Sequence, residues 1–187
     1  MKEKKRCPWA KGEKDIHYHD TEWGVPSYND DYIFEMLILE GFQAGLSWYT
    51  VLSKRENFRK AFNNFNYDNI AKYDIEKIEA LLKDKGIIRN KLKVNSAVTN
   101  AKAFMEVQKE FGSFSSYIWN FTGNKRIINK WTELSQVPAT SELSDKISKD
   151  LKKRGFKFVG STIIYSFLQA LGIIDDHLVS CPFKREF

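Results

Sequence analysis

The chain has 187 residues, of which 42% are hydrophobic and 14% aromatic, so it is long and apolar enough for one globular unit and is not a disordered protein. No run approaches the roughly 18 apolar residues of a membrane span, and the charged start lacks the apolar stretch of a secretory signal, so we expect no membrane segment and a cytoplasmic location. The net charge of +6 favours a polyanionic partner.

Helical periodicity begins near residue 30. Asp30 is a suitable N-cap for a helix whose apolar stripe contains Phe34, Leu37 and Ile38 at i, i+3 and i+4 spacing. Ser47 is a second suitable N-cap, for a helix through Val51, Leu52, Phe58 and Phe62. The sequence therefore predicts two consecutive helices in the first third of the chain.

The middle of the chain continues in the same way. Asp74 is expected to open a helix that ends at Gly86, and the longest periodic segment runs from about residue 91 to 111 before Gly112. Ser113 is expected to cap a short helix after it.

The last third contains one irregular segment and two helices. Residues 122–140 lack clear periodicity and are expected to be loop. Ser144 is expected to cap a helix that stops at Gly155, and a further helix follows Gly160 and ends at Gly172. With only fragments of strand alternation, the fold class is predicted to be all-α.

The turn between the last two helices has the features of an anion site. Gly155 and Gly160 bracket it, and the free N–H groups of the following helix point at it. Basic side chains surround it, among them Lys153 and Lys157. A helix-hairpin-helix that holds a DNA backbone has this layout, and an ordinary corner with solvated lysines is the alternative.

Both cysteines lie near histidines at opposite ends of the chain. Cys7 precedes His19, and His177 precedes Cys181. Two thiolates and two imidazoles make a complete tetrahedral zinc complement, with no position open for water. The spacing does not match a compact zinc finger, so unrelated residues at two chain ends remain the alternative.

A cluster of aromatic side chains with polar tips accompanies one carboxylate, Glu40. The aromatic residues are Trp9, Tyr18, Trp23 and Trp48. Such rings stack on a base or attract a cation, although core packing is the common role of a large aromatic residue. Glu40 is expected near the negative C-terminal end of its helix, where a carboxylate disfavours the helix, and this makes it a functional candidate.

The motifs together resemble the constitutive 3-methyladenine DNA glycosylase I family of the helix-hairpin-helix glycosylase superfamily, nearly end to end. They are RCPW at 6–9, YHDTEWGVP at 18–26, FEMLILEGFQAGLSW at 34–48, TVLSKREN at 50–57, GIIRNKLK at 86–93, LKKRGFKFVGSTIIYSF at 151–167 and DHLVSC at 176–181. The resemblance implies a single glycosylase unit over 1–187. A zinc-stapled terminal part would join a central helical part, at about 50–165, that carries the hairpin at 155–160.

The resemblance also implies roles for residues. One structural zinc per chain would be held by Cys7, His19, His177 and Cys181, with His17 left at the surface. Glu40 would be the catalytic carboxylate in a base pocket of Tyr18, Trp48, Trp23 and Trp9. DNA contacts would come from Gly155, Lys157, Gly160, Lys153 and Leu46. Leu46 would fill the gap left by a flipped base, and packing into the core is its alternative.

This chain departs from the family pattern at two positions. Asp15 stands where many relatives have an aromatic residue, which leaves one wall of the pocket undetermined. Phe42 stands where polar residues are common among relatives.

The implied reaction is hydrolysis of the N-glycosidic bond of 3-methyladenine in alkylated double-stranded DNA, by a monomer without an obligate protein partner. Bifunctional relatives carry a Schiff-base lysine where this chain has Thr162, so no lyase activity is expected. Asp175 stands near the aspartate that activates water elsewhere in the superfamily and is a minor candidate for that role.

Two other classes of function fit parts of the pattern. A non-catalytic DNA-binding module would keep the hairpin and metal and lose the pocket, against which the acid and its aromatics argue. A catalytic zinc hydrolase or deaminase is disfavoured by the closed ligand set and by the missing deaminase signature.

Overall fold

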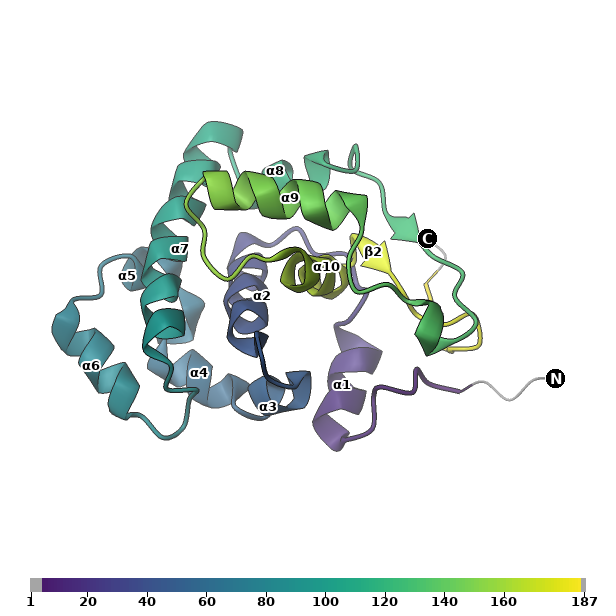
Figure 1. Cartoon of the computed structure of the whole chain (residues 1–187), viewed down its shortest axis with the longest axis horizontal. Helices are drawn as coiled ribbons and strands as arrows, with labels where there is room; N and C mark the ends of the chain where they lie inside the picture. Colours follow the sequence, from purple (N-terminus) through teal and green to yellow (C-terminus); the bar gives the residue numbers. More distant parts are fainter. Residues whose placement is uncertain (1–4, 186–187) are drawn as a thin grey trace.

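The computed structural model describes residues 5–185, and their arrangement is mainly helical (Figure 1). The α-helices are α1 (Glu13–Thr21), α2 (Asp30–Gln43), α3 (Trp48–Ser53), α4 (Arg55–Ala61), α5 (Tyr67–Ile70), α6 (Ile75–Lys83), α7 (Lys91–Phe111), α8 (Phe114–Asn120), α9 (Glu142–Lys153) and α10 (Ser161–Ala170). Short 3₁₀ helices are η1 (Asn63–Phe65) and η2 (Leu134–Gln136), and the strands are β1 (Ile127–Ile128) and β2 (Ile174–Asp175). No helix among the described residues is both long and apolar enough to cross a bilayer.

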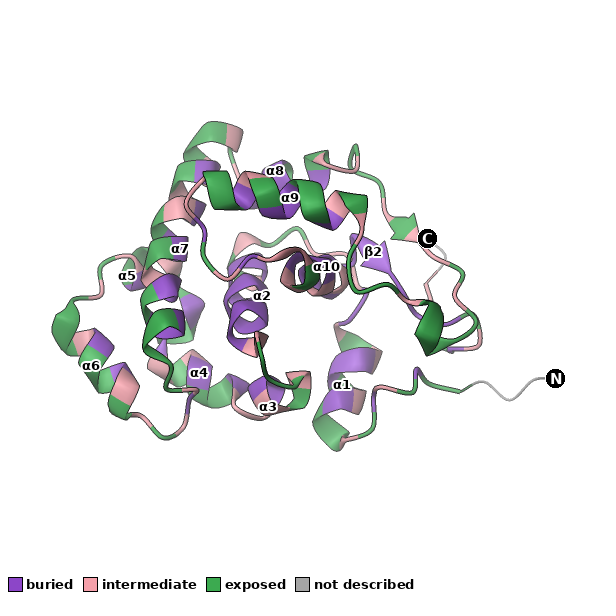
Figure 2. Ribbon diagram, viewed as in Figure 1, coloured by how far each residue is buried: buried purple, intermediate pink, exposed green. Residues whose placement is uncertain are grey.

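Helix α2 forms the centre of the molecule. Every residue from Ile33 to Phe42 is buried, and Figure 2 shows this helix surrounded by the others. It packs against α10, α7, α3 and α8. A helix that is apolar on all sides must be covered on all sides, and the run FEMLIL at 34–39 therefore places α2 in the core.

Three predicted N-caps are confirmed. The side chains of Ser47, Asp74 and Ser113 each accept a hydrogen bond from the backbone N–H three residues on. The helix predicted after Ser47 is interrupted at Lys54 and continues as α4. The long helix at 91–111 is confirmed with its end at Gly112, where φ is +83°.

The prediction that Asp30 caps its own helix is wrong. Asn29 is the N-cap, and its side chain accepts from the N–H of Tyr32 at 3.0 Å. The Asp30 carboxylate instead accepts from the backbone N–H groups of Phe114 at 2.9 Å and Ser115 at 2.8 Å. Asp30 therefore satisfies the first turn of α8, a helix more than 80 residues away in the sequence.

The predictions for Ser144 and Gly86 are also wrong. Ser141 is the N-cap of α9, and the Ser144 side chain completes a capping box by accepting from the Ser141 N–H. Helix α6 ends at Lys83, and the Gly86 N–H donates to the Asp84 carboxylate at 2.7 Å in the following turn.

Several elements were not expected from the sequence, among them α1, η2 and β1. Helix α1 has Gly12 as its N-cap, without a side-chain capping bond, and it lacks an apolar stripe that would predict it. The segment expected to be loop contains η2 and β1, and β1 pairs in parallel with β2 in the register Ile127 to Ile174. This pair anchors an otherwise irregular segment beside the C-terminal part of the chain.

The first and last described segments lie on the same side of the molecule (Figure 1). The backbone N–H of Leu178 donates to the sulfur of Cys7 at 3.5 Å. The fold therefore brings the residues around Cys7 and Cys181 together, as the predicted staple requires.

Candidate functional site

A cavity of about 320 Å³ opens between the N-terminal helices and α10. Its lining contains the predicted carboxylate and all four predicted aromatic residues: Glu40, Trp9, Tyr18, Trp23 and Trp48. These residues come from the segment before α1, from α1 and its following turn, from α2, and from the first residue of α3. The structure thus brings together residues that are up to 39 positions apart, from Trp9 to Trp48.

The aromatic rings form one continuous wall. Trp9 and Trp23 meet edge to face with ring centroids 5.0 Å apart, and Trp9 and Tyr18 have centroids 6.5 Å apart. Tyr18 in turn lies 5.2 Å from Trp48. Tilted contacts of this kind hold each ring in a fixed orientation and leave ring faces and edges for a ligand.

Glu40 lies in the last turn of α2 and is 3% exposed. Its Oε2 atom is buried and has no hydrogen-bond partner among the described residues. Removal of the carboxylate from water disfavours its charged form and raises the pKa of Glu40 to about 8. Near neutral pH the empty cavity therefore holds a largely neutral carboxyl group that a nearby cation would ionise.

Two further polar atoms of the cavity residues are unpaired. The Tyr18 hydroxyl and the Trp48 Nε1 are buried without a hydrogen-bond partner among the described residues. Burial also raises the pKa of Tyr18 well above its usual value, so this side chain stays a neutral phenol. An unpaired buried polar atom costs about 1–3 kcal/mol, and three on residues of one cavity indicate a site shaped for a polar, flat ligand.

The opposite wall was not expected from the sequence. It consists of Leu134, Val137, Pro138 and Ala139, which lie in or just after η2, together with residues of α10 and Asp176. This stretch lacks periodicity, and nothing in its composition marks it as part of a site.

Asp176 is the polar centre of that wall and is 2% exposed. Its Oδ1 accepts from Asn129 Nδ2 and Trp131 Nε1, and its Oδ2 accepts from the Tyr165 hydroxyl and Gln169 Nε2, all at 2.7 Å. Four donors fill the acceptor sites of the carboxylate. Asp176 therefore fastens the segment at 129–131 to α10.

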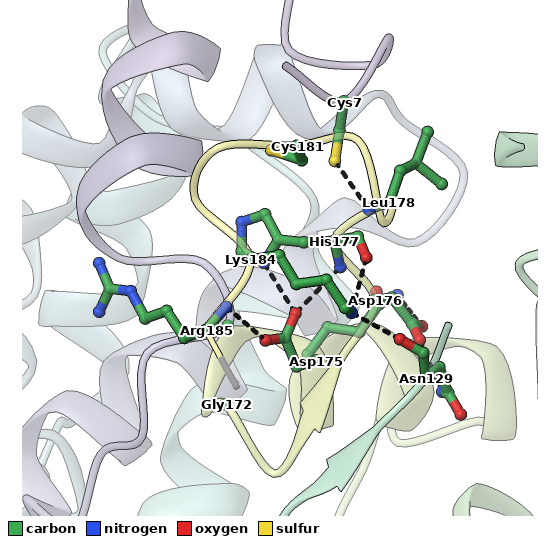
Figure 3. Close-up of polar contacts among 12 residues, drawn as sticks. Cys7, Asn129, Gly172, Asp175, Asp176, His177, Leu178, Cys181, Lys184 and Arg185 are labelled. Atoms are coloured by element: carbon green, nitrogen blue, oxygen red, sulfur yellow. Dashed lines mark hydrogen bonds and ion pairs between the residues drawn. The ribbon is translucent and has the colours of Figure 1, made fainter. Parts of the chain in front are cut away.

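Three of the four predicted metal ligands converge. One ligand atom each from Cys7, His19 and Cys181 lies within 4.8 Å of the other two, and all three residues are buried. The Cys7 thiol donates to Cys181, which lowers the pKa of Cys181 and, with burial, raises the pKa of Cys7. Figure 3 shows the two cysteines side by side, with His177 nearby.

His177 lies next to this group without being part of it. Its ring centroid is 4.8 Å from that of His19, and its Nε2 is buried without a partner among the described residues. Its Nδ1 is 2.8 Å from Asp175, and the Nδ1 of His19 is 2.7 Å from Asp20. A carboxylate on Nδ1 fixes an imidazole with Nε2 available as a ligand, so the group of Cys7, His19 and Cys181 could hold a metal ion, with His177 as the neighbouring candidate for a fourth ligand.

The cluster of cysteines and histidines directly supports the aromatic wall. The His19 ring lies 5.3 Å from Trp9 and 5.7 Å from Trp23, and the His177 ring lies 4.5 Å from Trp23. Cys7 itself lines the cavity. The predicted metal site and the predicted pocket are therefore parts of one structure.

Asp175 lies behind His177 rather than in the cavity lining. Its Oδ1 accepts from the backbone N–H of His177 at 3.0 Å, in addition to the Nδ1 contact (Figure 3). Its Oδ2 accepts from Arg126 and from the backbone N–H of Arg185, both at 3.3 Å. Burial pushes the pKa of Asp175 upward, but the hydrogen bonds from His177 outweigh it and the pKa is lowered. This geometry suits the orientation of an imidazole better than the activation of water.

Gly155 and Gly160 lie at the two ends of the turn between α9 and α10, where the sequence places them. Gly155 has φ of +94°, Gly160 is the N-cap of α10, and Lys153 and Lys157 are exposed. Asn100 of α7 braces the turn by accepting from the Lys157 N–H at 2.8 Å and donating to its carbonyl at 3.0 Å. Positive charge and free helix N–H groups therefore lie together on a braced turn.

The remaining singled-out residues are placed as follows. Leu46 is 42% exposed at the tip between α2 and α3, and so it is not a core residue. Asp15 does not line the cavity, and Phe42 is a core residue 4.8 Å from Phe58. His17 is exposed, as expected.

Known proteins resemble this chain over nearly its whole length. The family model for methyladenine glycosylases matches residues 9–185. The chain is 47% identical over 181 residues to the DNA-3-methyladenine glycosylase of Haemophilus influenzae, covering 96% of this chain and 97% of that protein. It is 45% identical over 177 residues to DNA-3-methyladenine glycosylase 1 of Escherichia coli, covering 94% and 95%. A solved structure of a variant 3-methyladenine DNA glycosylase I in complex with 3-methyladenine superposes with a TM-score of 0.93 at 32% identity, covering 100% of this chain and 99% of that one.

Proposed function

Because the chain belongs to the methyladenine glycosylase family, we propose that it hydrolyses the N-glycosidic bond of 3-methyladenine in alkylated double-stranded DNA. Relatives named for this activity cover nearly the whole chain at 45–47% identity, and a similar structure binds 3-methyladenine. The chain would act as a single glycosylase unit and as a monomer.

The observation that carries the proposal is the unpaired, buried Glu40 among aromatic rings. An N3-methylated adenine in DNA is a cation, whereas undamaged adenine is neutral. A cation within about 4–6 Å favours an ionised carboxylate, which lowers the pKa of Glu40 from about 8 and creates an ion pair. A neutral base supplies no such charge, so the cavity separates damaged from undamaged adenine by charge.

The aromatic wall adds to this discrimination. A cation over an indole or phenol face gains about 0.5–2 kcal/mol, depending on how far water is excluded. Trp9 and Tyr18 have fixed orientations through their contacts with other rings, so these side chains lose little conformational freedom when the base enters.

The chemistry needs little more than this stabilisation. The methylated base leaves as a neutral molecule, so the bond to the sugar is already weakened, and water takes its place at the sugar carbon. Ionised Glu40 would offset positive charge that moves from the base toward the sugar in the transition state. Asp175, with both oxygens occupied, would orient His177 instead of activating water.

DNA would be held by the hairpin and opened by the α2–α3 tip. The N–H groups at the start of α10, with Lys153 and Lys157, suit a backbone phosphate, and Leu46 suits the space left by an extruded base. Base extrusion costs a few kcal/mol, which contacts of this kind would offset.

The reaction would stop after hydrolysis. Thr162 lines the cavity at the position where a lyase needs an amine nucleophile, and a hydroxyl forms no Schiff base.

A zinc ion held by Cys7, His19, His177 and Cys181 would be structural. It would supply a cross-link between the two ends of the chain and no chemistry on the substrate, because the four ligands fill its tetrahedral shell. The protein residues that it would fix are the imidazoles against which Trp9 and Trp23 pack.

The test is chromatography of the bases released from methylated duplex DNA. We expect free 3-methyladenine and very little 7-methylguanine, with intact abasic strands until alkali is added. A DNA-binding module without activity would release no base, and strand cleavage before alkali would contradict the monofunctional mechanism.

A further inference from the structure

Helix α2 ends beside the cavity in carbonyl groups that need partners from elsewhere. The last carbonyls of a helix have no N–H within it, and a cation is the favoured neighbour at this negative end. The last turn of α2 contains no basic residue, and it contains the acidic Glu40 instead. After Gln43 the chain leaves the helix through Ala44 and turns at Gly45, where φ is +76°.

Lys93 of α7 supplies the missing cation. Its Nζ donates to the carbonyl oxygen of Phe42 at 2.8 Å and to that of Ala44 at 2.5 Å. These carbonyls lie on either side of Gln43, at the point where the helix becomes the tip. A single ammonium group therefore joins the end of α2 to the start of α7, across 51 and 49 positions of sequence.

This lysine is poorly placed for its own helix. It is the third residue of α7 after the N-cap Asn90, where the positive end of the helix dipole repels a cation. It is 6% exposed, and burial lowers the pKa of its ammonium group. A side chain that opposes local stability in two ways is compensated elsewhere, and the compensation here lies at the carbonyls of α2.

We propose that Lys93 is a positioning residue for the tip at 45–47, holding Leu46 in the one orientation that can enter duplex DNA. This inference rests on the proposed glycosylase function. Apart from Lys93, the tip is tied back by the Leu46 N–H, which donates to the Gln43 carbonyl at 2.7 Å. Apart from its chain neighbours, no described residue lies within 4 Å of the position that a Gly45 Cβ would occupy, so packing does not hold the turn there.

The aromatic residues of the base pocket have supports besides this clamp, although Gln43, between the two clamped carbonyls, also lines the cavity. Trp48 begins α3, which is capped by Ser47 and anchored by buried Val51 and Leu52. Loss of the clamp should therefore impair entry into duplex DNA and leave recognition of the free base unchanged. This separation distinguishes a positioning role from general support of the fold.

The first test is Lys93→Met, which keeps the length of the side chain and removes the charge and its donors. Single-turnover release of 3-methyladenine from duplex DNA is expected to fall about ten- to a hundredfold, the effect of a misplaced group. Affinity for free 3-methyladenine, followed by tryptophan fluorescence, is expected to change by less than about twofold. Lys91→Met is the matched control, because Lys91 is exposed on the same turn and loses the same charge.

A mutant cycle with Leu46→Ala tests the route. If Lys93 acts through Leu46, the double variant is expected to be no more than about twofold slower than Leu46→Ala alone. If the fold-losses of the two single variants multiply in the double variant, the proposal is wrong. It is also wrong if Lys93→Met loses affinity for the free base in parallel, or if Lys93→Met releases base from duplex DNA at the wild-type rate. Lys93→Gln, which keeps N–H donors without the charge, carries the same comparisons if the Met variant does not fold.

Measurement of the wild-type protein on the same duplex distinguishes failure of the proposed glycosylase activity from failure of the proposed role of Lys93. No release by the wild type would refute the glycosylase function itself. Release by the wild type, with the same rate in Lys93→Met, would refute only the role of Lys93.

Discussion

The two walls of the cavity each contain a buried carboxylate, and the two carboxylates differ in their hydrogen bonding. Asp176 accepts four hydrogen bonds at 2.7 Å and holds two segments of the chain together. Glu40 has an oxygen without a hydrogen-bond partner in the described part of the chain, and its pKa is raised to about 8. Two equally buried carboxylates thus differ in role: the fully hydrogen-bonded Asp176 stabilises the fold, and Glu40 keeps an oxygen available for a ligand.

The largest expected effect is on activity, at the unpaired carboxylate. Glu40→Gln keeps the shape and removes the charge that would stabilise the transition state, so base release should slow by about 10²–10³-fold. Single-turnover chromatography on methylated duplex DNA measures it. Asp175→Asn is the comparison variant, and if it alone abolished turnover, the assignment of Glu40 would be wrong.

The second effect is on stability, at the satisfied carboxylate. Asp176→Asn replaces an acceptor oxygen by an NH₂ group and leaves at least one buried donor unpaired, which should lower the free energy of unfolding by about 2–4 kcal/mol. Urea denaturation measures it. A variant as stable as the wild type would show that the four hydrogen bonds at Asp176 are not what holds segment 129–131 to α10.

The raised pKa of Glu40 should also make stability depend on pH. Native Glu40 keeps its proton up to about pH 8, whereas the unfolded chain releases it near the ordinary value of 4.5, so the native state binds more protons in this window. The Glu40 contribution to stability therefore falls as pH rises from about 5 to 8, by roughly 3 kcal/mol.

Glu40→Gln should remove that term, so that the variant is more stable than the wild type at pH 8 and about equal to it at pH 5. Thermal melting of both proteins across this range gives the difference. An advantage that did not grow with pH would contradict the raised pKa of Glu40.

A smaller effect should follow from removal of the proposed zinc ion. Without that ion the imidazoles of His19 and His177 would lose their fixed positions, and the wall of Trp9 and Trp23 would loosen. Affinity for 3-methyladenine should fall about tenfold, as it does when the supports of a site are lost. Fluorescence titration before and after chelation tests this, with readdition of zinc as the control. Unchanged affinity in the metal-free protein would show that the base pocket does not depend on the metal site.

Sequence reasoning found the residues that are close together in the chain or that carry distinctive chemistry. Glu40, Trp48 and the cysteines were singled out by their positions and by the family resemblance, and the structure places Glu40 and Trp48 in the cavity lining and the cysteines in one buried group. The helix ends at Gly112 and Gly155, where φ is positive, were also predictable from the sequence.

What the sequence did not reveal depends on contacts between distant segments. Asp176 gains its role from Asn129 and Trp131, more than 40 positions away, and Asp30 caps a helix that begins at Phe114. A carboxylate looks the same in sequence whether it caps its own helix or a distant one. Tertiary partners decided these cases over local propensity.

The contact between Cys7 and Cys181 also has a consequence for folding during synthesis. A nascent chain exposes its N-terminal part first, and most of α2 and its aromatic partners are made early. The imidazole behind Trp23 and the second sulfur belong to residues 177–181, which are synthesised more than 130 residues after the end of α2. In the proposed enzyme, a chain that lacks residues 177–181 would therefore lack the support behind Trp23, and its affinity for a damaged base should be lower.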